Sequence, residues 1–296
     1  MLSGFLLTLA FVEIALPLLL FLMRDRVVFL PSVEPAPEDG LAFLRGRADV
    51  DLVRVRRSDG RVLAAYDARP AGNEDPPAPV VLFLHGNGGN IANRLPLLED
   101  FVAGSGLRTL LLDYSGYGGN AGTPSEAEAY EDGVAAFDWL VDQGVAPERI
   151  VLYGESLGAA VALGVAERRV CAGVVAQSAF ASLSSMAFEA YPWMPLAGLL
   201  ARGSFPSDRR VRELEVPLLV VHGTRDGIIP FSQGEKLHRA AAAGTEFLAI
   251  EGAGHNDLLS VAGRPYLESL GERLRGWVGS RSGTLRPGME PPVPLD

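Results

Sequence analysis

Residues 150–166 read IVLYGESLGAAVALGVA, an apolar run followed by Gly154-Glu155-Ser156-Leu157-Gly158 and then by small apolar residues. A short apolar run such as Ile150–Tyr153 is typical of a strand buried on both faces. A chain that turns sharply from a strand into a helix leaves little room for side chains, and glycines at 154 and 158 provide that room. We therefore predict that Ser156 lies at a sharp strand-to-helix turn, where the helix N-terminus adds partial positive charge.

The sequence on both sides of this turn alternates between strand-like and helix-like segments. The other short apolar runs are Val80–Leu84, Thr109–Leu112, Gly173–Ala176, Leu218–Val221 and Phe247–Ile250. The helical segments between and around them are Ala92–Phe101, Ser125–Gln143, Ser156–Glu167, Phe231–Ala242 and Leu258–Val278. This alternation predicts an α/β fold with a mainly parallel central sheet and helices on both faces. Earlier in the chain, Val53–Arg57 and Arg61–Ala68 flank a turn signal and predict a β-hairpin.

The same patterns divide the chain into an N-terminal anchor, one large domain and a tail. Residues 24–50 are predicted to hold a linker and the first strand, and residues 51–278 the catalytic domain. Residues 179–216, between two predicted strands, are expected to form a small helical cap. Residues 279–296 are rich in Gly, Ser and Pro and are expected to be disordered.

The N-terminal segment Leu2–Met23 is apolar and long enough, at about 33 Å as a helix, to cross a bilayer core. Glu13 and Pro17 interrupt it. A cleavable signal peptide is the alternative, but no Lys or Arg precedes the segment and no small-residue cleavage site follows it. We favour a single-pass anchor at residues 1–23. Arg24 and Arg26 after the segment favour a cytoplasmic catalytic domain.

Composition excludes several other classes of function. The formal net charge of −10 repels phosphate backbones, so no nucleic-acid partner is expected. The single cysteine, Cys171, forms no internal disulfide, and no zinc-protease or phosphate-loop motif occurs, so no metal and no cofactor are expected. Gly86–Ile91 fails the G-x-G-x-x-G pattern at Ile91. Gly116–Ala121 fits the related G-x-G-x-x-A pattern, but Pro124 and a late helix start argue against a dinucleotide site.

A serine hydroxyl needs a base to act as a nucleophile, and the chain has only four histidines. His85 and His222 each end a predicted strand, and we expect both to bond to backbone. His238 lies on an amphipathic helix and is expected to be solvated. Only His255 follows the serine on a Gly-containing loop after the last strand, so His255 is the predicted base.

The base needs an acid that orients its imidazole ring and stabilises the charged form of that ring. Asp226 lies just after the Leu218–Val221 strand and before Gly227, and it is the predicted acid. Asp208 and Asp257 are the alternatives. Asp208 lies in a charged stretch that looks solvated, and Asp257 opens the last helix, where a carboxylate suits the helix dipole.

A tetrahedral oxyanion would need two backbone N–H donors. The residue after the nucleophile, Leu157, is predicted to supply one of them. The second is predicted to come from the Gly86–Asn90 loop, most simply from Asn87, because small flanking residues let that backbone approach a substrate.

Together these residues resemble the α/β-hydrolase superfamily, and closely its single-pass membrane-anchored members, which include lysophospholipid and monoacylglycerol lipases and protein depalmitoylases. The resemblance covers roughly residues 24–278. The motifs that carry it are Phe29–Ser32, His85–Asn90, Asp113–Glu126, Gly154–Gly158, His222–Pro230 and Gly254–Asp257. In one departure, members of this group usually carry Arg where this chain has Ser115.

The sequence therefore predicts a serine hydrolase that cleaves carboxylic esters or thioesters through an acyl-serine intermediate, with lipid-like or acylated substrates near a membrane. A serine peptidase of the same fold, or a non-catalytic binding protein, is the alternative. Within residues 179–216, Phe180, Tyr191 and Trp193 are candidates for the wall of an acyl-binding site. The other interpretation is that these rings pack the cap on its own core.

Overall fold

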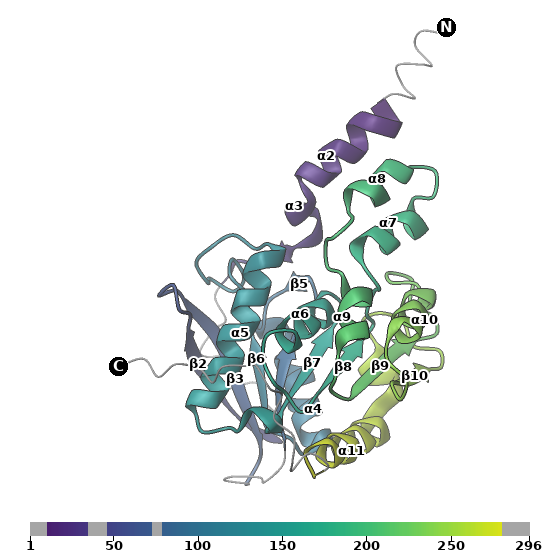
Figure 1. Cartoon of the computed structure of the whole chain (residues 1–296). Helices are drawn as coiled ribbons and strands as arrows, with labels where there is room; N and C mark the ends of the chain where they lie inside the picture. The colour runs from purple at the N-terminus through teal and green to yellow at the C-terminus, as the bar shows by residue number, and fades with distance from the viewer. Residues whose placement is uncertain (1–10, 35–45, 73–78, 280–296) are drawn as a thin grey trace, which may run out of the picture.

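An eight-stranded sheet forms the centre of the computed structural model, which describes residues 11–34, 46–72 and 79–279 (Figure 1). The strand order is β10-β9-β8-β7-β4-β6-β3-β2. The strands are β2 (Ala48–Arg56), β3 (Val62–Pro70), β4 (Val80–Leu84), β6 (Thr109–Leu112), β7 (Ile150–Glu155), β8 (Gly173–Gln177), β9 (Leu218–Gly223) and β10 (Glu246–Ile250). From β10 to β6 all neighbours are parallel, whereas β3 pairs antiparallel with β6 and with β2. The predicted hairpin and mainly parallel sheet are confirmed.

Helices cover both faces of this sheet, as predicted. Alternating side chains of β4 show the division, because Val81 and Phe83 pack with one apolar cluster and Leu82 and Leu84 with the other. The first cluster includes α4 (Leu95–Ser105) and α11 (Leu258–Gly279). The second includes α5 (Glu126–Asp142), α6 (Leu157–Ala166) and α10 (Phe231–Ala240). Short 3₁₀ turns, η3 (Ala92–Arg94) and η4 (Pro147–Arg149), precede α4 and β7.

Local sequence explains where two of these helices begin and bend. At the start of α5, the Ser125 side chain accepts a hydrogen bond from Glu128 N, which satisfies a free donor of the first turn. The last helix differs from the predicted continuous Leu258–Val278 segment. Gly263 within α11 has φ 69° and ψ −170°, and Pro265 follows it, so the helix is bent there.

The segment between β8 and β9 holds three short helices, α7 (Leu183–Ala190), α8 (Pro195–Leu200) and α9 (Ser207–Glu213). Helices α7 and α8 pack on each other and project from the domain on the same side as the N-terminal helices (Figure 1). Helix α9 packs instead on α6 and α10, so only the first two helices form a projecting cap.

The N-terminal described residues form a π-helical turn η1 (Phe11–Ala15), then α2 (Leu16–Leu22) and α3 (Arg24–Val28). Helix α2 packs against α8. No helix within the described residues is long and apolar enough to cross a membrane. The predicted anchor begins at residues 1–10, which lie outside the described residues, as does the predicted disordered tail from residue 280 on.

Immediately after α3, the chain forms the short strand β1 (Leu30–Pro31), which pairs in parallel with β5 (Gly88–Gly89). The predicted linker therefore includes a segment that is hydrogen-bonded to the domain before β2 begins.

Candidate active site

Ser156 lies at the junction of β7 and α6 with φ 56° and ψ −117°, a backbone conformation that is costly for a residue with a side chain. The two glycines that flank it have no space for a side chain. A Cβ atom at Gly158 would lie 1.9 Å from the Leu84 carbonyl oxygen, and one at Gly154 would lie 2.3 Å from the Gly158 carbonyl oxygen. The sharp turn predicted from the pentapeptide therefore requires glycine at both positions.

The structure brings Ser156, His255 and Asp226 together from three neighbouring loops at the carboxyl ends of β7, β9 and β10. The Nε2 atom of His255 lies 3.0 Å from Ser156 Oγ, and its Nδ1 atom lies 2.7 Å from Asp226 Oδ2. The His255 and Asp226 side chains are 8% and 0% exposed. This geometry is a continuous hydrogen-bond chain from a buried carboxylate to a serine hydroxyl.

The loop after β9 holds the Asp226 carboxylate in one orientation. Its Oδ1 atom accepts hydrogen bonds from the backbone N–H groups of Ile228 and Ile229, at 2.9 and 2.8 Å. Burial alone would raise the pKa of Asp226, but hydrogen bonds from His222 and His255 outweigh burial and hold that pKa well below its usual range. Asp226 therefore stays ionised while it faces His255.

The other histidines are committed to other contacts. His222 is fully buried, and its Nε2 atom donates to the Ile229 carbonyl oxygen at 2.9 Å and lies 3.4 Å from Asp226 Oδ2. His85 is also buried, with Nδ1 2.6 Å from the Gly86 carbonyl oxygen and Nε2 3.2 Å from Asp113 Oδ1. His238 was expected to be solvated. It is instead half-buried, and its Nε2 atom lies 3.0 Å from the Thr245 carbonyl oxygen.

The two alternative acids lie elsewhere. Asp257 accepts a hydrogen bond from Gly254 N at 2.7 Å, so its carboxylate braces the turn that carries His255. Asp208 lies in the first turn of α9 and is half-buried there. Of the three aspartates, Asp226 is the one hydrogen-bonded to His255.

The two predicted oxyanion donors belong to backbone segments close to Ser156. Leu157 is the first residue of α6, so helix geometry gives its N–H no intrahelical acceptor. The start of the Gly86–Asn90 loop lies against the serine, since a Cβ atom at Gly86 would lie only 3.4 Å from Ser156 Cβ. The Asn87 carbonyl accepts from Leu30 N and from the Tyr117 hydroxyl. Its side chain donates to the Val28 carbonyl.

The three candidate substrate-binding rings are not in one place. Phe180 is buried in the core, where its ring packs edge-to-face with Phe205. Tyr191 and Trp193 lie on the turn between α7 and α8, are 46% and 56% exposed, and contact each other at 6.1 Å between ring centroids. Phe180 is thus the buried member of the set, and the other two rings face outward.

One buried polar cluster was not found from sequence. The Ser115 N–H and hydroxyl both donate to the buried Asp132 carboxylate, at 2.7 and 2.9 Å. Arg57 from the end of β2 forms ion pairs with Asp132 and Glu128. The resemblance singled out Ser115 because members of that group usually carry Arg there, and in this chain the guanidinium next to Ser115 and Asp132 comes from Arg57. Only the unusual Ser115 could have signalled this cluster.

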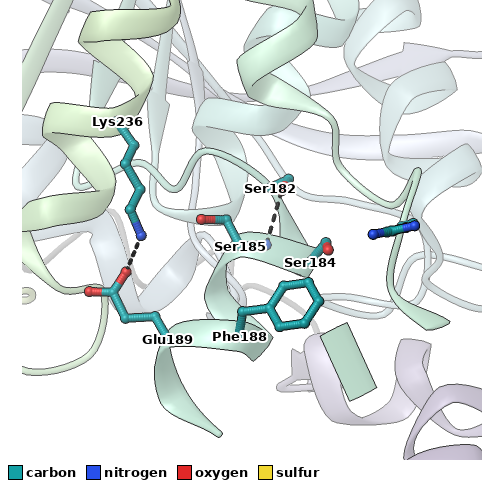
Figure 2. A pocket seen from close by; sticks show the side chains of 7 residues that line it. Ser182, Ser184, Ser185, Phe188, Glu189 and Lys236 are labelled. Atoms are coloured by element: carbon teal, nitrogen blue, oxygen red, sulfur yellow. Dashed lines mark hydrogen bonds and ion pairs between the residues drawn. The ribbon is translucent and has the colours of Figure 1, made fainter. Parts of the chain in front are cut away.

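A separate polar hollow of about 510 Å³ opens beside the cap, lined by Ser182, Ser184, Ser185, Phe188, Glu189, Arg202 and Lys236 (Figure 2). Within it, Lys236 on α10 pairs with Glu189 on α7 at 2.6 Å. Its lining does not include Ser156, Asp226 or His255. In residues 11–34, 46–72 and 79–279, no group of three or more His, Cys, Asp or Glu residues is placed to hold a metal ion.

The fold and the arrangement around Ser156 define a protein of the α/β-hydrolase class. A family model described as "Alpha/beta hydrolase family" matches residues 81–215. The chain is 32% identical over 268 residues to alpha/beta hydrolase domain-containing protein aho-3 of Caenorhabditis elegans, covering 86% of this chain and 76% of that protein. The chain therefore belongs to the alpha/beta hydrolase family.

Two further similarities agree with this assignment. An uncharacterized protein of Mycobacterium tuberculosis is 39% identical over 249 residues, covering 83% of this chain and 85% of the relative. A solved esterase structure from Pyrococcus furiosus aligns with a TM-score of 0.63 and 22% identity, over 85% of this chain and 98% of that chain. At that identity, the second similarity shows a shared fold.

Proposed function

We propose that this protein is a serine hydrolase that cleaves carboxylic ester or thioester bonds through an acyl-serine intermediate. The observation that carries the proposal is the hydrogen-bond chain from Asp226 through His255 to Ser156. A base hydrogen-bonded to a serine hydroxyl makes that hydroxyl nucleophilic at neutral pH, and a carboxylate behind the base orients it and stabilises its charged form. Membership of the alpha/beta hydrolase family and the fold shared with esterases support the same reaction class.

In the proposed reaction, Ser156 Oγ attacks the carbonyl carbon while His255 Nε2 takes the hydroxyl proton. Asp226 stabilises the resulting imidazolium, and the N–H groups of Leu157 and Asn87 stabilise the oxyanion. The tetrahedral intermediate collapses when His255 protonates the leaving alcohol or thiol, which leaves the acyl group on Ser156. Water then attacks the acyl group with His255 again acting as the base, and the acid product leaves.

The same proposal places the enzyme at a membrane, with residues 1–23 as its anchor and the catalytic domain on the cytoplasmic side. Its support is an exposed apolar surface shared by two elements that pack together. The exposed apolar residues of the N-terminal elements and the cap are Phe11, Ile14, Leu18, Leu19, Leu22, Met23, Val27, Phe188, Tyr191, Trp193 and Leu199. Exposed apolar side chains gathered on elements that pack together are typical of membrane or protein contact. Tyrosine and tryptophan rings favour the lipid–water interface, so lipid is the proposed partner of Tyr191 and Trp193.

The reaction class is tested with Ser156→Ala against a panel of ester, thioester and amide substrates of graded acyl length. We expect ester turnover to fall by several orders of magnitude, because members of such a group act as a unit. A fluorophosphonate probe should label the wild type and not Ser156→Ala. Ser58→Ala, at an exposed turn, is the matched control and should behave as the wild type. Labelling that persists in Ser156→Ala would move the nucleophile elsewhere, and a preference for amides would favour a peptidase.

The membrane context is tested separately in the full chain expressed in cells. We expect the protein to stay in the membrane fraction after a high-salt wash and to be released by detergent. Trp193 fluorescence should be quenched by lipids brominated near the headgroup, and the difference from Trp193→Phe isolates that signal from the other tryptophans. A protein found free in solution would refute the membrane proposal and leave the reaction class standing.

A further inference from the structure

The loop that carries Asn87 is held by a segment that lies outside the central sheet. Leu30 N donates to the Asn87 carbonyl and Ser32 N to the Gly89 carbonyl, both at 3.0 Å. These bonds join β1 to β5 in parallel register. The pairing links the residues directly after α3 to the loop whose start lies against Ser156.

Side chains of the same loop extend this contact on both ends. Asn87 Nδ2 donates to the Val28 carbonyl at 3.0 Å, and Asn90 Nδ2 donates to the Glu34 carbonyl at 2.9 Å. On the other side of the segment, Gly118 N donates to the Ser32 carbonyl at 2.9 Å. Residues 28–34 are therefore held between the Gly86–Asn90 loop and the loop after β6.

The segment is itself fixed to the core. Phe29 is only 2% exposed and belongs to the same apolar cluster as α5 and α6. Its ring centroid lies 6.2 Å from that of Phe205. Because Phe29 is anchored, the backbone groups on either side of it are presented to the loop at a fixed position.

The contacts of Asn87 restrict the position of its backbone nitrogen. Its carbonyl accepts from Leu30 N and from the Tyr117 hydroxyl, and its side chain donates to the Val28 carbonyl. The carbonyl carbon, Cβ and the nitrogen are the three heavy atoms bonded to a tetrahedral Cα. Once the first two are held, the position of the nitrogen follows. Within the described residues these hydrogen bonds use the carbonyl and the side chain of Asn87 and leave its backbone N–H unused, and the neighbouring Gly86 lies against Ser156.

We propose that residues 28–34, together with Tyr117, are positioning residues of the active site that fix the Asn87 N–H as an oxyanion donor. This inference rests on the proposed esterase function. The segment connects the proposed membrane helices to the domain, and on this proposal the connection is also a part of the catalytic apparatus. Loss of one oxyanion donor costs about 100- to 1000-fold in kcat in serine hydrolases, and a displaced donor should cost a fraction of that loss.

The first test removes a single backbone donor from the segment in the full chain. Leu30→Pro deletes the N–H that bonds to Asn87, and Leu30→Ala keeps that N–H while shortening a side chain that is largely exposed. Phe29 already has φ −101° and ψ 123°, the extended conformation that a residue before proline prefers. We expect Leu30→Pro to lower kcat on a soluble ester about 10-fold or more with little change in KM. Leu30→Ala, which keeps the N–H, should lose much less kcat than Leu30→Pro.

The second test removes one hydroxyl from the other side of the loop. Tyr117→Phe deletes the donor to the Asn87 carbonyl and keeps the ring. Its matched control is Tyr66→Phe, because the hydroxyl of Tyr66 is buried and has no hydrogen-bond partner in the described part of the chain. We expect Tyr117→Phe to lower kcat several-fold and Tyr66→Phe to leave it unchanged.

The decisive readout is affinity for an alkyl boronic acid, whose tetrahedral adduct with Ser156 mimics the oxyanion. If the segment positions the donor, boronate affinity falls by the same factor as kcat in Leu30→Pro and Tyr117→Phe. Labelling of both variants by the fluorophosphonate probe then shows that Ser156 is still a reactive nucleophile. Should Leu30→Pro unfold the protein, Tyr117→Phe decides. Wild-type kcat and boronate affinity in both variants, with Ser156→Ala inactive, would overturn the proposal and leave the esterase function intact. An active Ser156→Ala would overturn the function itself.

Discussion

Substitution of Asp226 by asparagine tests the candidate active site most sharply, because the surroundings of this side chain determine which way an amide would point. In the wild type, Oδ1 accepts from Ile228 N and Ile229 N, and Oδ2 faces His255 Nδ1. In Asp226→Asn, the amide oxygen must take the place of Oδ1, since only an acceptor suits two backbone donors. The amide NH₂ then faces His255.

This orientation inverts the tautomer of His255. A donor opposite Nδ1 forces Nδ1 to act as an acceptor, so the ring proton moves to Nε2 and faces Ser156 Oγ. The base is then unable to take the serine proton. The opposite amide orientation would preserve the useful tautomer, but it leaves the Ile228 and Ile229 N–H groups unpaired, at about 1–3 kcal/mol each.

These energies set the size of the effect. A cost of about 2–6 kcal/mol limits the productive orientation to at most roughly 3% of molecules, so kcat should fall by at least about 30-fold. The upper limit is near 10⁴-fold, the loss that a wrong tautomer causes in a serine protease. We expect the observed loss to lie between these limits in a variant that still folds, because the side-chain volume is unchanged.

The assay is steady-state hydrolysis of a soluble short-chain ester, with circular dichroism to verify folding. Asp257→Asn is the matched control: its amide oxygen still accepts from Gly254 N, so activity should remain within a few-fold of the wild type. A folded Asp226→Asn that keeps more than about a tenth of wild-type kcat would refute the reasoning, and an inactive Asp257→Asn beside it would reassign the acid.

Three further outcomes follow from the geometry. Gly158→Ala should abolish stable folding or cost more than about 4 kcal/mol in urea unfolding, because its Cβ would lie 1.9 Å from the Leu84 carbonyl oxygen. Gly276→Ala, at a helical position with nothing within 4 Å, should instead raise the unfolding midpoint slightly. Folding lowers the pKa of Asp226, so its charged form stabilises the protein fully above pH ~4. The difference in free energy of unfolding between the wild type and Asp226→Asn should therefore narrow as pH falls below that value. Trp193→Ala should leave kcat/KM on soluble short esters unchanged and lower turnover of esters presented in vesicles, and equal losses in both assays would argue for an acyl-binding role.

Much of the fold follows from local sequence, because buried parallel strands are read from short apolar runs. The predicted strand Val80–Leu84 agrees with the structure residue for residue, and so does Thr109–Leu112. The turn at Ser156 was predictable for a different reason: a sharp strand-to-helix turn needs glycine on both sides, although Gly154 contacts the adjoining helix and Gly158 contacts Leu84 of the neighbouring strand β4. Asp226 and His255 were then found by elimination among few residues, and their hydrogen bonds to each other and to Ser156 agree with that choice.

The features that sequence did not predict depend on contacts between distant residues or on backbone groups. The ion pair of Arg57 with Asp132 joins residues 75 apart, and nothing near either residue indicates the other. The pairing of β1 with β5 uses main-chain N–H and C=O groups, which every residue except proline carries, so no residue type marks it. The bend in α11 is different, because Gly263 and Pro265 did carry a local signal for it and the predicted Leu258–Val278 segment did not use that signal.

The short distance along the chain between α3 and β1 has a consequence for how such proteins can be recombined. Helix α3 ends at Val28 and β1 begins at Leu30, so a single residue, the buried Phe29, joins them. A junction placed after Pro31 would exchange β1 together with the N-terminal helices. The helices are therefore not an independent module that can be exchanged between homologues at that point. A chimaera that keeps the hydrogen bonds between residues 28–34 and the Gly86–Asn90 loop must be joined before Val28. Any replacement helix must then end so that Phe29 keeps its buried position.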